Sequence, residues 1–206
     1  MKAKVMIAIP NMGQIHVGLT TWLLKNVLKP RDDVEHIVVI APNGLVPHDS
    51  ARNFCVQAFL KSDNTHLFFI DSDITPPDDA IEKLLGAGVD IVSGVYYGMR
   101  YSKETGTQEK VAHVYTKEVG EDGKERLRSV SGEGVQIVRR CGGGCLMISR
   151  SALERITPPW FSFRYDEIGN MTYGEDIYFC IAAEASGFTI HANFDVVCKH
   201  AKEVLL

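Results

Sequence analysis

The fold of this chain is decided by the stretch Leu67-Phe68-Phe69-Ile70-Asp71-Ser72-Asp73-Ile74-Thr75-Pro76-Pro77. Its first four residues are apolar without alternation, which is typical of a strand covered on both faces of a sheet. In extended backbone, Asp71 and Asp73 point the same way, so both can reach one site at the strand end. Two close carboxylates repel each other, and a divalent cation is their simplest partner. The stretch therefore predicts a buried strand ending at a metal site, with an ordinary capped turn as the alternative.

Apolar runs on both sides of this stretch predict further strands at 5–9, 36–40, 89–95, 135–138, 145–148, 188–190 and 196–197. Apolar residues at helical spacing predict helices after Gly13 and from about residues 49, 77, 149 and 174. Strand and helix units in succession indicate a mainly parallel central sheet flanked by helices, with ligands at the carboxyl ends of the strands. The length favours one α/β domain over residues 1–206.

Two segments break this alternation. Polar residues and glycines dominate 98–134, where we predict a strand at Val111–Val119 and a turn at Glu121-Asp122-Gly123. We interpret this excursion as a hairpin and as a candidate lid. The second segment, 164–173, is predicted to be a loop that leads into a helix.

The composition is that of an ordinary globular protein, with 45% hydrophobic and 23% charged residues. A net charge of −4 argues against a nucleic-acid groove, because phosphate binding needs concentrated Lys and Arg. No apolar run approaches the roughly 20 residues that span a bilayer. The start of the chain has no small-residue cleavage site. We therefore expect a cytoplasmic protein without a signal peptide or transmembrane segment.

The five cysteines are scattered and odd in number, so they do not indicate a disulfide framework. Buried free thiols are the favoured interpretation. The alternative is a structural zinc site made of Cys141, Cys145, Cys198 and His200.

Three later features are candidates for chemistry. Glu175 and Asp176 open a helix, where acids suit the dipole, but a carboxylate there can also accept a proton from an attacking hydroxyl. The glycines at 142–144 allow the backbone to approach a ligand or a crossing strand closely. His200 follows a predicted strand and is either a hydrogen-bonded surface residue or a ligand.

Taken together and in order, these motifs resemble those of GT-A glycosyltransferases, especially family 2-like and polypeptide N-acetylgalactosaminyltransferase-like catalytic domains. The resemblance covers about Val5 to His200. It rests on motifs that occur in this order: Phe69-Ile70-Asp71-Ser72-Asp73 with Pro76-Pro77, Gly142-Gly143-Gly144-Cys145-Leu146-Met147-Ile148, Trp160-Phe161, Gly174-Glu175-Asp176-Ile177-Tyr178-Phe179-Cys180, Gly187 and His200.

The resemblance implies a glycosyltransferase of hexosyltransferase type that uses Mn2+ or Mg2+ and transfers a sugar from a nucleotide-sugar donor to an acceptor hydroxyl. Asp73 matches the metal-binding aspartate of the DXD motif, His200 matches a histidine that completes the metal site, and Asp71 lies near the metal or the ribose. The implied donor-binding residues are Pro10, Asn11, Arg52, Asp71, Ser72, Gly143 and Gly144.

On the acceptor side, the resemblance implies that Trp160 offers a stacking face for a sugar. Glu175 and Asp176 match the catalytic acidic pair, with Asp176 as the base in an inverting member and both residues positioning groups in a retaining one. The acidic turn that family 2 enzymes carry after the second strand is replaced here by Ala41-Pro42-Asn43-Gly44. The base of the nucleotide is therefore not fixed by a motif, and we expect UDP rather than GDP.

Two other functions stay open. A sugar nucleotidyltransferase shares the broad architecture, but the chain has no glycine-rich phosphate loop with a basic residue after the first strand. A non-catalytic module that binds nucleotide sugars or glycans would use Glu175 and Asp176 only to cap a helix.

Overall fold

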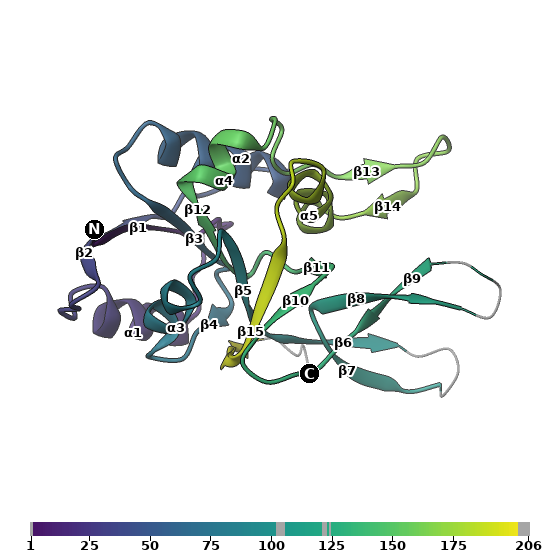
Figure 1. Ribbon diagram of the computed structural model, residues 1–206, viewed down its shortest axis with the longest axis horizontal. Coiled ribbons are helices and arrows are strands. Elements are labelled where there is room, and N and C mark those ends of the chain that lie inside the picture. Colours follow the sequence, from purple (N-terminus) through teal and green to yellow (C-terminus); the bar gives the residue numbers. More distant parts are fainter. Residues whose placement is uncertain (1, 102–105, 121–122, 124, 202–206) are drawn as a thin grey trace.

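The structure is a computed structural model that describes residues 2–101, 106–120, 123 and 125–201. Its centre is a seven-stranded sheet (Figure 1). In spatial order the strands are β10 (Val135–Val138), β15 (Ile190–Val197), β5 (Ile91–Val95), β12 (Cys145–Ser149), β3 (His66–Ile70), β1 (Ala3–Ala8) and β2 (Val34–Ile40). Five strands run in one direction, while β12 and β10 run against them. The mainly parallel α/β sheet predicted from the sequence is confirmed.

Helices cover both faces of this sheet (Figure 1). On one face lie α2 (His48–Leu60), α4 (Arg150–Arg155) and α5 (Glu175–Ala185), and on the other lie α1 (Val17–Asn26) and α3 (Ala80–Gly86). Strand β3 shows why the sequence needs both layers. Leu67 and Phe69 pack into the first core and Phe68 and Ile70 into the second, because successive side chains of a strand point to opposite faces.

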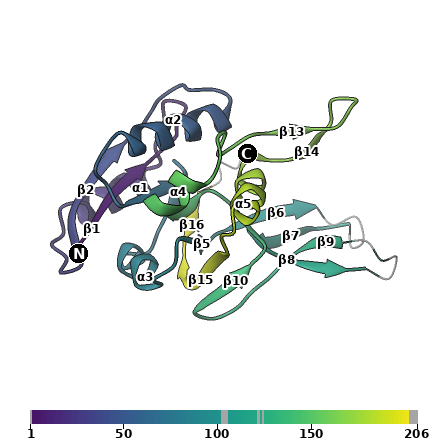
Figure 2. The same ribbon diagram turned by 45° about the horizontal axis from the view of Figure 1, so that its top comes forward.

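Short hairpins project from the same end of the sheet, as both ribbon views show (Figures 1 and 2). One hairpin pairs β6 (Tyr97–Tyr101) with β7 (Gln108–Ala112). The next joins β8 (Val114–Val119) to β9 (Glu125–Ser129), with β11 (Arg140–Cys141) beside β8. A third pairs β13 (Arg164–Tyr165) with β14 (Met171–Tyr173) ahead of α5.

Two details differ from the sequence prediction, and a third lies largely outside the described residues. The segment 164–173 contains the β13–β14 hairpin and is not only a loop. The predicted strand at 111–119 is divided at His113, because its N–H donates to the Tyr96 carbonyl and its own carbonyl accepts from Gly142 N–H. The predicted turn at 121–123 falls largely on residues outside those described, although Gly123 N–H donates to the Gly120 carbonyl.

The two predicted final strands are one strand, β15, paired with β5 on one side and with β10 on the other. Its apolar and polar residues alternate from Ile190 to Asp195, a period-two signal that the short apolar runs at its ends obscured. Among the described residues, no helix is both long and apolar enough to cross a lipid bilayer.

Candidate active site

The Asp71-Ser72-Asp73 tip lies at the carboxyl end of β3, as predicted, but its two carboxylates do not share one partner. Asp71 N–H donates to the Gly144 carbonyl (3.0 Å), and its own carbonyl accepts from Ile74 N–H (2.9 Å). This bond closes a turn over the tip before β4 (Ile74–Thr75) begins. Because the backbone turns here, the same-side geometry expected of extended residues is lost, and the two aspartates face different groups.

Asp71 belongs to a partly buried network centred on the buried Arg52 of α2. The Arg52 side chain donates from Nη2 to Asp71 Oδ1 (2.7 Å), from Nε to Glu175 Oε1 (3.2 Å) and from Nη1 to the Gly143 carbonyl (3.2 Å). Burial alone would raise the pKa of Asp71, but the Arg52 charge, the nearby His48 and the hydrogen bond from Arg52 outweigh it and lower the pKa to about 2. Asp71 is therefore an ionised carboxylate with a fixed partner.

The position of Arg52 corrects one prediction. The resemblance placed Arg52 near the base or the diphosphate, yet only 1% of its surface is exposed. Each of the three guanidinium nitrogens donates a hydrogen bond to a protein group. Arg52 thus joins the strand tip to the acidic start of α5 and is a positioning residue.

Asp73 faces His200 across a second short pairing. Strand β16 (Lys199–His200) pairs with β4, and Ala201 N–H donates to the Asp73 carbonyl (2.8 Å). The His200 ring lies with Nε2 3.1 Å from Asp73 Oδ2 and Nδ1 2.7 Å from the Tyr97 carbonyl. A carbonyl can only accept, so Nδ1 carries the hydrogen, and in the neutral ring the lone pair of Nε2 faces a carboxylate. A cation between these two groups relieves that contact.

Glu175 and Asp176 open α5, as predicted, and have different surroundings. Glu175 is paired with Arg52, whereas Asp176 Oδ1 accepts from the N–H of its neighbour Ile177 (2.7 Å). Burial and the adjacent charge of Glu175 raise the pKa of Asp176 to about 6. A carboxyl with this pKa is a competent proton acceptor near neutral pH.

The glycines at 142–144 allow protein side chains to approach the backbone closely. A Cβ on Gly142 would lie 2.0 Å from Tyr96 Oη, one on Gly143 would lie 2.8 Å from Arg52 Cζ, and one on Gly144 would lie 2.9 Å from Asp71 Oδ2. The side chains of the site itself therefore explain this glycine run.

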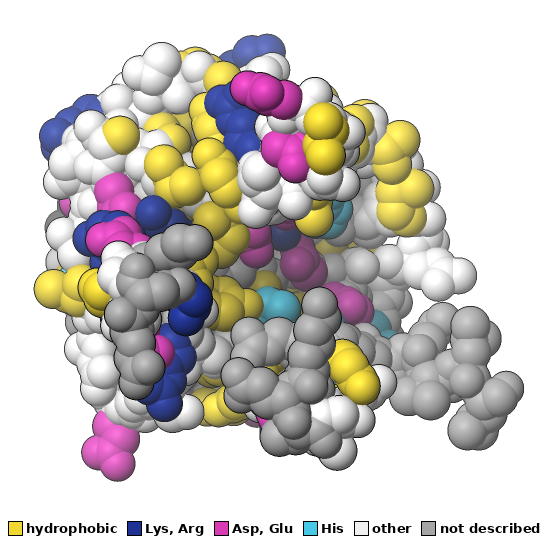
Figure 3. Space-filling model, turned by 90° about the vertical axis from the view of Figure 1, so that its right-hand side faces the viewer, with side chains coloured by type: hydrophobic (Ala, Val, Ile, Leu, Met, Phe, Trp, Pro, Cys, Tyr) yellow, Lys and Arg dark blue, Asp and Glu magenta, His cyan; other side chains and the backbone are white. Residues whose placement is uncertain are grey.

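Two adjoining cavities surround the strand tip. A cleft of about 820 Å³ includes Asp73, and a smaller cavity of about 220 Å³ lies next to it; both are bordered by Gln14 and Ser72. The smaller cavity contains the buried Pro10 together with Asn11, whose side chain donates to the Ile9 and Pro42 carbonyls (3.1 Å each). Figure 3 shows acidic and histidine side chains gathered in the hollow on this side of the molecule.

Trp160 is placed differently from the prediction. It is 7% exposed, lies in the core beneath α2, α4 and α5, and donates from Nε1 to the Leu153 carbonyl (2.9 Å). Its ring is covered by protein, so the expectation of a stacking face for a sugar is wrong. The sequence signal was misleading because an indole N–H satisfied inside a core cannot be told from an exposed one by motif alone.

Sequence reasoning missed two residues of the site. His48, in the first turn of α2, has Nε2 3.8 Å from Asp71 Oδ1. Tyr96 directly follows β5, stacks on His113 with ring centroids 4.8 Å apart, and accepts a hydrogen bond from Gly144 N–H. The place of Tyr96 at the carboxyl end of a parallel strand was an available signal.

The cysteines of the zinc alternative are not gathered at one point. Cys141 lies beside Cys180, with sulfurs 3.9 Å apart, and Cys198 lies beside Cys145. Hydrogen bonding with these thiol neighbours, together with burial, raises the pKa of Cys180 and of Cys198. No cluster of three metal-binding side chains occurs in the part of the chain that the structure describes, so the proposed zinc ligands do not form a site.

No protein-family model matches this chain, and no curated protein matches it. Solved structures do resemble it. A197 from STIV is 23% identical, with a TM-score of 0.59 over 98% of this chain and 87% of that chain. GalNAc-T7, in a structure with UDP, GalNAc and Mn2+, is 8% identical, with a TM-score of 0.63 over 99% of this chain and 45% of that chain. The chain thus spans less than half of GalNAc-T7, and it has the GT-A-like fold that the sequence predicted.

Proposed function

We propose that this protein, acting as one domain, is a metal-dependent glycosyltransferase that transfers a hexosyl group from a nucleotide-sugar donor to an acceptor hydroxyl, with a UDP-sugar as the favoured donor. The observation that carries the proposal is the Arg52 network. It ties a donor-side carboxylate, Asp71, to the acceptor-side residue Glu175 at the carboxyl end of the sheet. The likeness to GalNAc-T7, solved with UDP, GalNAc and Mn2+, supports the donor class.

The donor would occupy the two cavities at the strand tip. Pro10, Asn11 and Ser72 border the smaller one, which suits the nucleoside, and Asp73 borders the larger one, which suits the diphosphate. We assign the donor sugar to the glycine side of the tip, at Gly143 and Gly144.

The residues present fit a divalent ion at Asp73 and His200. A carboxylate oxygen and an imidazole nitrogen are ligands for such ions, and their 3.1 Å approach brings them to one point. Diphosphate oxygens and water would complete the coordination. Mn2+ or Mg2+ bound there would neutralise charge on the departing diphosphate. Asp71 is already paired with Arg52, so we assign it to the nucleotide and not to the metal.

Asp176 would act as the general base. The acceptor oxygen attacks the anomeric carbon, the bond from that carbon to the diphosphate oxygen breaks, and the acceptor proton passes to Asp176. Glu175 is held by Arg52, so it serves as a positioning residue. Attack from the side opposite the diphosphate inverts the configuration at the anomeric carbon.

The test is nucleoside diphosphate release from a panel of UDP-sugars and GDP-sugars, with Mn2+, with Mg2+ and with a chelator. We expect metal-dependent release from wild type, none from Asp73→Ala, and wild-type release from Asp33→Ala, which alters an exposed aspartate at the far end of the sheet. Pyrophosphate release from a nucleoside triphosphate and a sugar 1-phosphate would instead identify a nucleotidyltransferase. Donor binding without turnover on any acceptor would identify a binding module.

A further inference from the structure

His16, which no motif in the sequence singled out, lies at the mouth of the large cleft. We propose that its Nε2–H donates a hydrogen bond to the diphosphate of the donor and to the nucleoside diphosphate that leaves. The inference rests on the proposed function, because it assigns one more residue to the same donor site.

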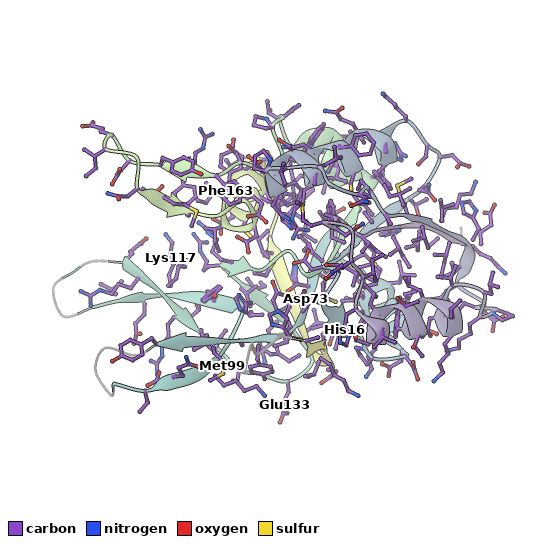
Figure 4. The ribbon with its side chains drawn as sticks, turned by 180° about the vertical axis from the view of Figure 1, so that it is seen from behind. His16, Asp73, Met99, Lys117, Glu133 and Phe163 are labelled. Atoms are coloured by element: carbon purple, nitrogen blue, oxygen red, sulfur yellow. The ribbon has the colours of Figure 1, made fainter. Side chains whose placement is uncertain are left out.

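The backbone ties His16 to the strand tip. His16 N–H donates to the Ser72 carbonyl (2.8 Å), so the residue is fixed against the turn that carries Asp73. Both side chains border the cleft of about 820 Å³. Figure 4 shows His16 and Asp73 next to each other near the middle of the molecule.

The ring of His16 is oriented by the helix that it caps. Its Nδ1 accepts from Gly18 N–H (3.1 Å) in the first turn of α1. Nδ1 therefore carries no hydrogen, and the ring hydrogen lies on Nε2. Among the described residues, Nε2 has no hydrogen-bond partner. The capping bond thus fixes the orientation of the exposed His16 ring, and its Nε2–H is free to donate to a ligand.

The charge of the cleft explains why such a donor is needed. Among the described residues that border it, Asp73 alone carries a full charge, and that charge is negative. A diphosphate entering beside a carboxylate needs hydrogen-bond donors as well as a cation. Gln14 and Ser72 also have donor groups there, but the His16 ring is oriented by its bond from Gly18 N–H, and the His16 backbone is fixed by its bond to the Ser72 carbonyl.

Two substitutions separate the donor role from the capping role. Asn and Asp are both good N-cap residues, so His16→Asn keeps the cap and removes the Nε2 donor, while His16→Asp keeps the cap and places a negative charge there. Leu24→Glu is the matched control. Leu24 is 78% exposed on the same helix, and its charge would lie about 12 Å further along the axis, beyond the screening length at physiological salt.

The experiment measures dissociation constants by calorimetry with Mn2+ present, for UDP and GDP and for the nucleosides uridine and guanosine. We expect His16→Asn to weaken diphosphate binding about tenfold, the lower end of the loss for a hydrogen bond to a charged group. His16→Asp should lose about a further tenfold, and this loss should shrink as salt is raised. Nucleoside binding and the melting temperature of the free protein should stay at the wild-type level in both variants, and Leu24→Glu should bind like wild type.

Two other results would overturn either the role of His16 or the proposed function. Wild-type diphosphate affinity in His16→Asn, or an equal loss for diphosphate and nucleoside, overturns the assignment of His16 and leaves the proposed function standing. Failure of the wild-type protein to bind either diphosphate overturns the proposed function and this inference with it.

Discussion

Replacement of Asp176 by Asn should stabilise the fold while it removes activity. The pKa of Asp176 is raised from 3.8 to about 6, first by burial and then by the charge of Glu175. A carboxyl with a higher pKa in the folded state binds its proton more tightly there than in the unfolded chain. Its charge therefore costs stability, and that cost develops as pH rises from about 4 to about 6 and is complete above.

The shift of about two pKa units corresponds to about 2 to 3 kcal/mol at neutral pH. Asn cannot ionise, and its amide oxygen can still accept from Ile177 N–H, so Asp176→Asn should recover most of this energy. The gain should be present at about pH 8 and should vanish below about pH 4.

Urea unfolding at several pH values measures this gain directly, with Asp33→Asn at an exposed position as the control. The donor turnover of wild type should rise with pH through an apparent pKa of about 6, and the variant should show none. The reasoning is refuted if Asp176→Asn is no more stable than wild type at about pH 8, or if its gain does not decline as the pH is lowered.

Three further outcomes follow from the site. Arg52→Met should cost about 3 kcal/mol in urea unfolding, because it leaves two partly buried carboxylates without their buried partner; a loss under about 1 kcal/mol would contradict the burial argument. Asp73→Ala should keep the melting temperature of the free protein but lose the extra stabilisation that Mn2+ gives in the presence of UDP, and a retained Mn2+ effect would remove this residue from the metal site. Gly144→Ala should destabilise by about 1 to 3 kcal/mol because its Cβ meets side chains at 2.9 and 3.0 Å. Gly86→Ala, in a helix with open space around it, should be neutral or slightly stabilising, and equal effects of the two would exclude a steric cause.

Much of the fold was predictable from the sequence because the buried strands are short, nearly continuous apolar runs that stop at polar residues. β1 and β3 are examples, and their ends mark the edge where the site forms. Which strands pair with each other was harder to predict from the sequence. β12 inserts between β3 and β5 in the opposite direction, and nothing in its own residues distinguishes that from a parallel place.

The sequence identified several residues that lie together at the strand tip, but it missed His48 and Tyr96 and did not predict how the side chains are arranged. The resemblance brought Asp73 and His200 to one site across 127 positions, and the structure places them 3.1 Å apart. It also assigned Arg52 to the donor and Trp160 to the acceptor, and both are buried. Motif spacing fixes which residues lie near an edge of the sheet, whereas burial depends on what the rest of the chain packs over them.

The buried guanidinium of Arg52 explains why the site has two acidic pairs in which the members are not equivalent. In the strand tip it pairs with Asp71, and at the start of α5 it pairs with Glu175. Asp73 and Asp176, the other member of each pair, make no direct ion pair with Arg52. Asp73 then faces His200, where a cation fits, and Asp176 has a raised pKa, which suits a base. The Arg52 guanidinium thus leaves one carboxylate of each pair, Asp73 and Asp176, for the proposed donor-side and acceptor-side roles. Exchange of Arg52 for a neutral residue should therefore disturb both functions at once, which neither Asp73→Ala nor Asp176→Asn would do alone.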